Sequence, residues 1–215
     1  MPFDAFNDLV AVAPVAEAPQ ILVVKSALGA NTLKEFIELA KAKPGALNYG
    51  SISNNMVLFM EAFMRDTGTR MTEIGYKGGG DNTTAIITRQ VDLQFDNMVF
   101  SLPQVRAGRL RAMGVAAAKR SPVAPEVPTL AEAGGPSLVI GSWYGLFAPA
   151  GTPREILNKL HAEISKALAI PELRERYQST GLEPIGSNSE QFAAEVRDDT
   201  ARWAKVARTA NVRAE

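Results

Sequence analysis

Two short loops supply the residue types in this sequence that are best suited to binding an anion. The first loop, residues 50–55, lies between an extended run at 47–49 and an apolar helical run at 56–64. Backbone N–H groups in the first turn of a helix lack intrahelical acceptors, and the helix dipole favours negative charge at that end. We therefore expect this loop to bind an anion, with helix capping alone as the alternative. Its candidate residues are Gly50, Ser51, Ser53, Asn54 and Asn55.

The second loop repeats this arrangement one strand later. It follows a strand expected at 71–75 and precedes a helix expected to begin near Asp81. The glycines here are also typical of a tight turn that requires positive φ, and the lysine is either a counter-charge for the anion or a solvated surface residue. Two such loops at consecutive strand ends predict a single binding site. The candidates from this loop are Tyr76, Lys77, Gly78 and Gly79.

Four further residues are candidates for the same site. Asp96 and Asn97 end a strand expected at 91–97, and ligands of open α/β sheets bind at the carboxyl ends of strands. These two side chains either meet an amino or hydroxyl group of the ligand or cap the next helix. Trp143 and Tyr144, in the apolar stretch 138–147, either line a hinge or cleft or pack in the core.

The order of the expected elements predicts an α/β fold. The apolar, mostly β-branched run at 21–24 is typical of a strand buried on both faces, and helices and strands then alternate. A preceding strand at 9–15 is expected to be interrupted by Pro14 and Pro19, and 129–133 to form a short helix. The last part of the chain reads as amphipathic helices whose apolar faces lack an obvious sheet. Those helices are expected at 154–169, 171–179 and 188–210, with a short strand at 182–185.

Composition argues against several other functions. The 215 residues include 23 basic and 23 acidic residues, with no basic stripe interleaved with aromatics, so nucleic-acid binding has no support. No apolar run approaches the roughly 20 residues that span a bilayer, and residues 1–20 show no signal peptide. The sequence has no Cys, and His161 is its only histidine. We therefore predict no metal site, no cofactor and no catalytic residue.

Six motifs along the chain resemble one family of receptors. They are PGALNYGS at 44–51, YKGGG at 76–80, QVDLQFDN at 90–97, AGRLRAMGV at 107–115, RSPVAPEVPTLAEAG at 120–134 and SWYGLFAPAGTP at 142–153. In this order they resemble the tripartite tricarboxylate transporter substrate-binding proteins, also called the Bug or TctC family of extracytoplasmic solute receptors. The resemblance implies a periplasmic-binding-protein-like (type II) fold whose two lobes close over a small organic carboxylate. It also implies that the receptor needs no cofactor and delivers its ligand, in the periplasm, to a membrane permease.

The sequence departs from the family pattern in two places. Family members begin with a signal peptide and a strand–loop–helix unit, and this sequence is expected to begin after that unit. The first loop is also shorter than the family pattern, with Ile52, Met56 and Val57 in place of further polar residues. The expected organisation is a remnant of lobe 1 and crossover at 1–19, a ligand-binding lobe 2 with a mixed, mostly parallel sheet at 20–142, and a hinge strand with C-terminal helices of an incomplete lobe 1 at 143–215.

Three functions remain open at this point. The favoured one is passive binding of a small carboxylate for transport. The second is a truncated interaction or sensor module that self-associates, with a homodimer forming through the incomplete lobe, because exposed apolar patches drive association. An enzyme acting on a carboxylate is least favoured, since Ser51 lacks the G-x-S-x-G context of a nucleophile and has no histidine base near it in sequence.

Overall fold

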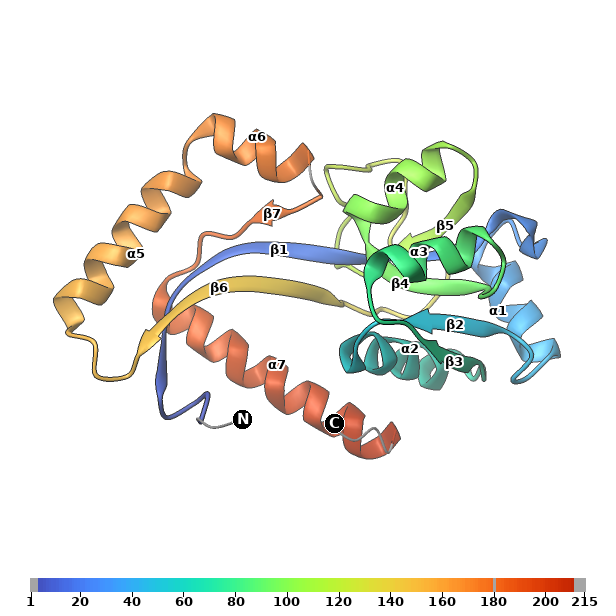
Figure 1. The fold of residues 1–215 in the computed structure, drawn as a ribbon, viewed down its shortest axis with the longest axis horizontal. Coiled ribbons are helices and arrows are strands. Elements are labelled where there is room, and N and C mark those ends of the chain that lie inside the picture. The colour runs from blue at the N-terminus through green and yellow to red at the C-terminus, as the bar shows by residue number, and fades with distance from the viewer. Residues whose placement is uncertain (1–3, 180, 211–215) are drawn as a thin grey trace. The chain divides into compact units, whose positions relative to one another are not determined.

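The computed structural model describes residues 4–179 and 181–210, which form two compact units. Within the described residues, unit 1 comprises 4–18 and 142–204, and unit 2 comprises 19–141 and 205–210. The chain passes from one unit to the other within β1 (Leu9–Lys25), within β6 (Gly141–Pro149) and within the last helix, α7 (Ser189–Ala210) (Figure 1).

Unit 2 is built on a mixed sheet of five strands. Its order is β3 (Thr72–Gly75), β2 (Asn48–Ser51), β4 (Leu93–Asn97), the C-terminal part of β1, and β5 (Leu110–Val115). β2 is parallel to β3 and β4, whereas β1 is antiparallel to β4 and β5. Four strands therefore run in one direction and β1 runs against them. This confirms the predicted mixed α/β sheet.

Helices pack on both faces of this sheet. On one face, Ile21 and Val23 of β1 form a core with α3 (Gly79–Ile87) and α4 (Met98–Arg106). On the other face, the Phe63 ring of α2 (Asn54–Thr67) lies between Phe36 of α1 (Leu33–Ala42) and Phe95 of β4, with centroid distances of 6.2 and 6.1 Å. A short 3-10 helix, Ser26–Leu28, connects β1 to α1. Both faces are buried, which is the arrangement expected of a complete α/β lobe.

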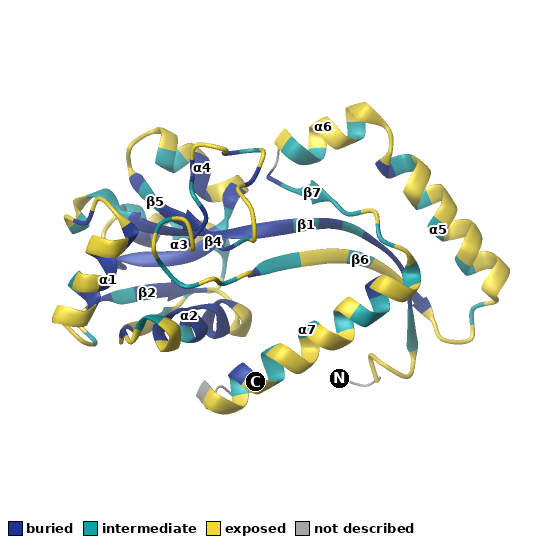
Figure 2. Ribbon diagram, turned by 180° about the vertical axis from the view of Figure 1, so that it is seen from behind, coloured by how far each residue is buried: buried dark blue, intermediate teal, exposed yellow. Residues whose placement is uncertain are grey.

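Unit 1 has a smaller core. It contains the N-terminal part of β1, β6, β7 (Glu183–Pro184), α5 (Arg154–Leu168), α6 (Pro171–Ser179) and most of α7 (Ser189–Ala210). A cluster of Val12, Ala13 and Ala148 packs against α5, and Phe192 of α7 contacts two aromatic rings of β6. Most of α5 is exposed, as Figure 2 shows, and Leu168 is its one buried residue.

Two expectations about local structure are wrong. β1 continues through Pro14 and Pro19 as one strand of 17 residues. The proline φ is compatible with an extended strand, so each proline removes one ladder donor without ending the element. Residues 129–133 form turns and not a helix, because Thr129 bridges to Val115 of β5 and Gly134 takes a left-handed φ of 82° soon afterwards.

Most other elements lie where they were expected. α6 occupies the predicted residues, and β7 lies inside the predicted 182–185 strand. α2 and α3 each begin two residues earlier than expected, so both include polar or glycine residues of the preceding loops. Among the helices of the described residues, none combines the length and apolar character that crossing a membrane requires.

Candidate ligand-binding site

The two candidate anion-binding loops, at 50–55 and 76–79, lie side by side at the carboxyl ends of the strands of the unit 2 sheet. β2, β3 and β4 are parallel, so their carboxyl ends face the same edge. Ser51 at the end of β2 pairs with Gly75 at the end of β3, and the Tyr76 N–H donates a 2.7 Å hydrogen bond to the Ser51 carbonyl oxygen. This bond ties the start of the second loop to the start of the first.

Each loop leads directly into the N-terminus of a helix. Ser53 is the N-cap of α2 and Gly78 is the N-cap of α3, both with extended backbones (φ −161° and −166°). Within the described residues the Ser53 side chain makes no capping hydrogen bond, and a glycine has no side chain with which to make one. Ser53 and Asn55 are exposed. Neither N-cap residue therefore caps its helix through a side chain, an arrangement that suits an anion at the helix N-terminus.

The glycines of the second loop are not explained by backbone strain. Gly78 has an extended φ of −166°, and Gly79 and Gly80 are absent from the positive-φ residues of the described chain. A Cβ added at any of the three would meet nothing within 4 Å. The tight-turn interpretation is therefore wrong. The protein itself does not fill the space beside this loop.

Gly50 and Ser51 make contacts inside the protein. A Cβ at residue 50 would lie 1.9 Å from Oδ1 of Asn82, so the absence of a side chain allows α3 to pack on β2. Ser51 is 2% exposed, and its hydroxyl donates a 2.5 Å hydrogen bond to Oε1 of Glu73. Residues 53–55 of the same loop are exposed at the surface.

Asp96 is buried beneath the sheet edge and not exposed on it. Its carboxylate accepts hydrogen bonds from the Ser101 hydroxyl at 2.7 Å, from the Asn97 N–H at 2.8 Å and from Nε2 of Gln94 at 3.2 Å. Burial raises the pKa of Asp96, and these three hydrogen bonds partly offset that rise. The structure thus places Asp96 as an acceptor that fixes the start of α4 to β4.

Asn97 joins β4 to the antiparallel strand β1. It pairs in register with Gln20, and its Oδ1 accepts a 2.9 Å hydrogen bond from Nε2 of Gln20. Asn97 is also the N-cap of α4, although its side chain makes no capping bond within the described residues. Of the two candidates at the end of β4, Asn97 is the half-exposed one.

Three buried carboxamides near this edge were missed by sequence reasoning. Gln20, Asn82 and Gln94 are at most 2% exposed, and in each the amide oxygen accepts no hydrogen bond within the described residues. A polar residue beside or within an apolar run was the available signal, as in Gln20 before the run at 21–24. Buried amide groups usually have partners, so these three carboxamides, on β1, α3 and β4, form an unusual polar layer within the apolar core of unit 2.

The other candidates divide between the two units. Tyr76 is half-buried and packs against the core of unit 2, and Lys77 is exposed. Trp143 and Tyr144 lie on β6 in unit 1, where the Trp143 indole N–H donates to Oδ2 of Asp199 at 3.2 Å and the indole ring packs 5.4 Å from the Phe192 ring. Tyr144 is 47% exposed.

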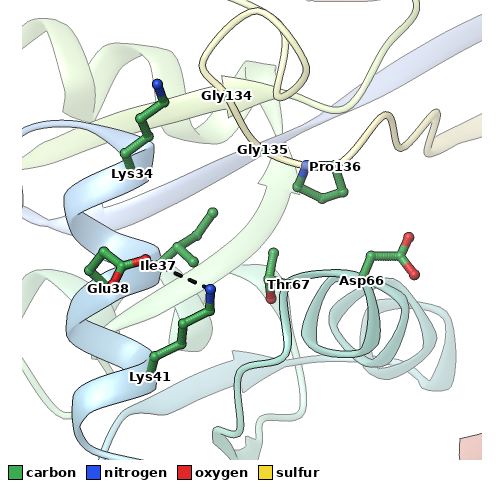
Figure 3. A pocket seen from close by; sticks show the side chains of 9 residues that line it. All are labelled: Lys34, Ile37, Glu38, Lys41, Asp66, Thr67, Gly134, Gly135 and Pro136. Carbon is green, nitrogen blue, oxygen red and sulfur yellow. Dashed lines mark ion pairs between the residues drawn. The ribbon is translucent and has the colours of Figure 1, made fainter.

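A separate cavity of about 460 Å³ lies elsewhere on unit 2 (Figure 3). It is found at the C-terminal end of α2, opposite the end that follows the first loop. Its charged side chains are two lysines and two carboxylates, with a Lys41–Glu38 ion pair at 3.7 Å. The charges balance, so this cavity does not select an anion. Its lining consists of Lys34, Ile37, Glu38, Lys41, Asp66, Thr67, Gly134, Gly135 and Pro136.

No cluster of three or more histidine or acidic side chains suited to a metal ion occurs in the described residues. His161 lies on α5, with Nε2 3.4 Å from the Ser187 carbonyl oxygen. The candidate site offers helix N-terminal backbone N–H groups and exposed polar residues of the two loops, at the ends of parallel strands.

A mixed α/β lobe with two helix N-termini at one sheet edge is the class of fold found in periplasmic solute-binding proteins. The chain belongs to the tripartite tricarboxylate transporter receptor family, TctC, whose model matches residues 1–212. This confirms the resemblance found in the sequence.

Relatives of known sequence and structure agree with this membership. Protein BugT of Bordetella pertussis is 31% identical over 210 residues, which are 97% of this chain and 64% of BugT. R. palustris Rpa4515, whose structure was solved with adipate, is 32% identical in sequence to this chain. Its structure superposes with a TM-score of 0.88, and the match covers 98% of this chain and 71% of Rpa4515. MatC of Rhodopseudomonas palustris with bound malate is also 32% identical, with a TM-score of 0.79 over 95% of this chain and 71% of MatC.

The matches cover less than two thirds of the length of most of the curated relatives. A protein from the tcbD-tcbE intergenic region of Pseudomonas sp. strain P51 is 31% identical, and the match covers 96% of this chain and 62% of that protein. This coverage agrees with the predicted incomplete second lobe.

Proposed function

We propose that the chain binds a small organic carboxylate through the first-turn backbones of α2 and α3, without chemical conversion. The observation that carries the proposal is the open space beside Gly78, Gly79 and Gly80 at an uncapped helix N-terminus. Glycine permits close approach of a ligand to the backbone, and a helix N-terminus favours an anion. The neighbouring loop adds the exposed polar residues 53–55.

The ligands of two solved relatives support a carboxylate as the anion. Rpa4515 is described with adipate and MatC with malate. Both ligands are dicarboxylates, so we favour a dicarboxylate here, with one carboxylate held at the two loops. Family membership further supports a periplasmic location and delivery of the ligand to the membrane permease of a tripartite transporter.

The proposal is tested by measuring ligand binding to the 215-residue chain with calorimetry and thermal unfolding against adipate, malate, citrate, acetate and a neutral diamide. A carboxylate at about one hundred times its dissociation constant adds about 2.7 kcal/mol of stability. For a chain of this length, each kcal/mol of added stability raises Tm by roughly 2–4 °C. We expect a shift with at least one carboxylate and none with the diamide.

A glycine variant localises the binding. Gly79→Val puts a side chain into the open space beside the second loop, and its Cβ meets no protein atom within 4 Å. We expect it to weaken carboxylate binding at least tenfold, about 1.4 kcal/mol, with no fall in Tm of the free chain. Gly151→Val is the matched control, because a Cβ at residue 151 in unit 1 also meets nothing within 4 Å. Equal binding by the two variants would refute the assignment of the site, and conversion of the acid during incubation would indicate an enzyme.

A further inference from the structure

The large apolar side chains that unit 2 exposes lie together at the carboxyl end of its sheet. In the described part of this unit there are four of them, and Phe100 and Val139 are the most exposed, at 54% and 43%. Ile52 and Val99 are each 36% exposed. Exposed apolar residues scattered singly over a surface need no explanation, whereas a group of them marks an interaction site. We call these four side chains the apolar rim.

Three members of the apolar rim follow strands that end beside the two loops. Ile52 is the residue after β2, in the first loop. Val99 and Phe100 lie in the first turn of α4, which begins directly after β4. β2 and β4 are parallel and adjacent in the sheet, and adjacent strands are about 4.8 Å apart. These side chains therefore leave the backbone at the same end of two neighbouring strands.

Val139 lies at the same end of the sheet because its neighbour in sequence is bonded there. The Ile140 N–H donates a 2.8 Å hydrogen bond to the carbonyl oxygen of Ala116, directly after β5, and the Ile140 carbonyl oxygen accepts a 3.0 Å bond from the Gln20 N–H. Gln20 pairs in register with Asn97, the last residue of β4. Because β4 and β5 run in the same direction, the apolar rim extends along the carboxyl ends of β2, β4 and β5.

The core of unit 2 does not account for the apolar rim. Met98 and Leu102 of α4 are buried in that core. Val99 and Phe100 lie between them in sequence and are exposed. The outward side of a surface helix is usually polar, and the first loop contains no charged side chain. Folding of unit 2 therefore does not explain why these positions are apolar, whereas contact with an apolar group of a ligand does.

We propose that the ligand is a carboxylate with an extended apolar body, an aliphatic chain or an aromatic ring. Its carboxylate binds at the two loops, and its apolar body packs on the apolar rim. Each methylene group that leaves water for such a contact favours binding, whereas a hydroxyl buried there without a hydrogen-bond partner opposes it. The inference rests on the proposed carboxylate site and adds the class of acid, which is one with an apolar chain in preference to a short hydroxy acid such as malate.

A second copy of the chain explains the apolar rim less well than a ligand does. Stable protein interfaces bury about 800 Å² on each partner, and four partly exposed side chains supply only a fraction of that area. The rim is also continuous with the two loops, since Ile52 belongs to the first of them. A ligand held by its carboxylate at these loops therefore has its remaining atoms beside the rim.

The test compares the binding of adipate and glucarate to the 215-residue chain by calorimetry. The two acids have the same carboxylates and the same chain length, and glucarate carries a hydroxyl on every carbon between its carboxylates. We expect adipate to bind at least about tenfold more tightly than glucarate, because its methylene groups leave water.

The double variant Val99→Ala/Phe100→Ala assigns this preference to the apolar rim. It should bind the two acids with similar affinities, through loss of adipate affinity. Ile156→Ala is the control, because it truncates a side chain that is 50% exposed on α5 of unit 1, and it should keep the preference for adipate. The ratio of the two affinities does not change when a variant merely lowers the folded fraction.

Each other outcome has a defined meaning. Similar affinities of the unaltered chain for the two acids, or a preference for adipate that the double variant keeps, overturns the inference and leaves carboxylate binding in place. Binding of neither acid by a chain that binds citrate or acetate does the same. Binding of no carboxylate at all refutes the proposed function and this inference with it. A dimer mass that the double variant abolishes, without a preference for adipate, overturns the inference and assigns the apolar rim to a second copy.

Discussion

Gly50→Ala tests whether the first loop is positioned by the packing of α3 on β2. The added Cβ would lie 1.9 Å from Oδ1 and 3.0 Å from Cγ of Asn82. Non-bonded carbon atoms pack best at about 3.5–4.0 Å, and a Cβ is essentially never found within 3.0 Å of a heavy atom outside its own and the two neighbouring residues. Asn82 is 2% exposed in the first turn of α3, so its side chain cannot move into solvent. The Asn82 side chain, α3 or the end of β2 must therefore shift.

Overpacking of a buried contact costs about 1–3 kcal/mol. We therefore expect Gly50→Ala to lower the free energy of unfolding by that amount, and to lower Tm by roughly 2–4 °C for each kcal/mol. Because β2 leads into the first loop, we also expect weaker carboxylate binding than in the unaltered chain. The control is Gly75→Ala at the end of the neighbouring strand, where a Cβ meets nothing within 4 Å. It should change stability little.

The assay is urea unfolding followed by circular dichroism for the two single variants and for Asn82→Ala with and without Gly50→Ala. Asn82→Ala removes both the clashing atom and a buried amide oxygen that has no hydrogen-bond donor in the described residues. In its background, Gly50→Ala should cost at least about 1 kcal/mol less than in the unaltered chain, which is a typical coupling for residues in contact. A Gly50→Ala chain as stable as the unaltered one, or a cost that is the same in both backgrounds, would show that the packing argument is wrong.

Three further predictions concern stability. Burial, followed by the carboxylates of Glu183, Glu195 and Asp199, raises the pKa of Glu17 in the folded chain. The folded state therefore binds the Glu17 proton more tightly than the unfolded state does. As a result, the free energy of unfolding falls as pH rises through the raised pKa of Glu17. Glu17→Gln should raise the free energy of unfolding at pH 7 by about 0.2–1 kcal/mol, and a urea titration at about pH 3.5 should show the gain disappear, since unfolded glutamate is then largely protonated too. Ser101→Ala removes a hydrogen bond to the buried Asp96 carboxylate, which should cost about 1.5–3 kcal/mol at pH 7 and less at pH 4; an equal loss at both pH values would argue against an ionised partner. Phe63→Ala should cost about 3–5 kcal/mol, because its fully buried ring lies between two other rings, and a smaller loss in calorimetry would mean that the site collapses around the change.

The sequence was sufficient to predict the loops and most of the elements that flank them. Polar and glycine residues between a short strand and an apolar helical run marked both loops, and the structure brings them to the same edge. Helix starts were less accurate, because intrinsic propensity argues against Gly79 and Gly80 in a helix. The contact of Asn82 with Gly50 shows the tertiary packing that accompanies the earlier start of α3.

The polar layer beneath the site depended on information that local patterns do not contain. Gln20 reaches Asn97 only because β1 is antiparallel to β4, a pairing between residues 77 positions apart in sequence. An alternating order of strands and helices predicts parallel neighbours, which would have placed Gln20 at the opposite end of the sheet from Asn97. Because β1 is antiparallel, the buried Gln20 amide lies at the same end of the sheet as the two loops. Predicting which residues support such a site requires the direction of each strand, and strand direction is determined by the whole fold.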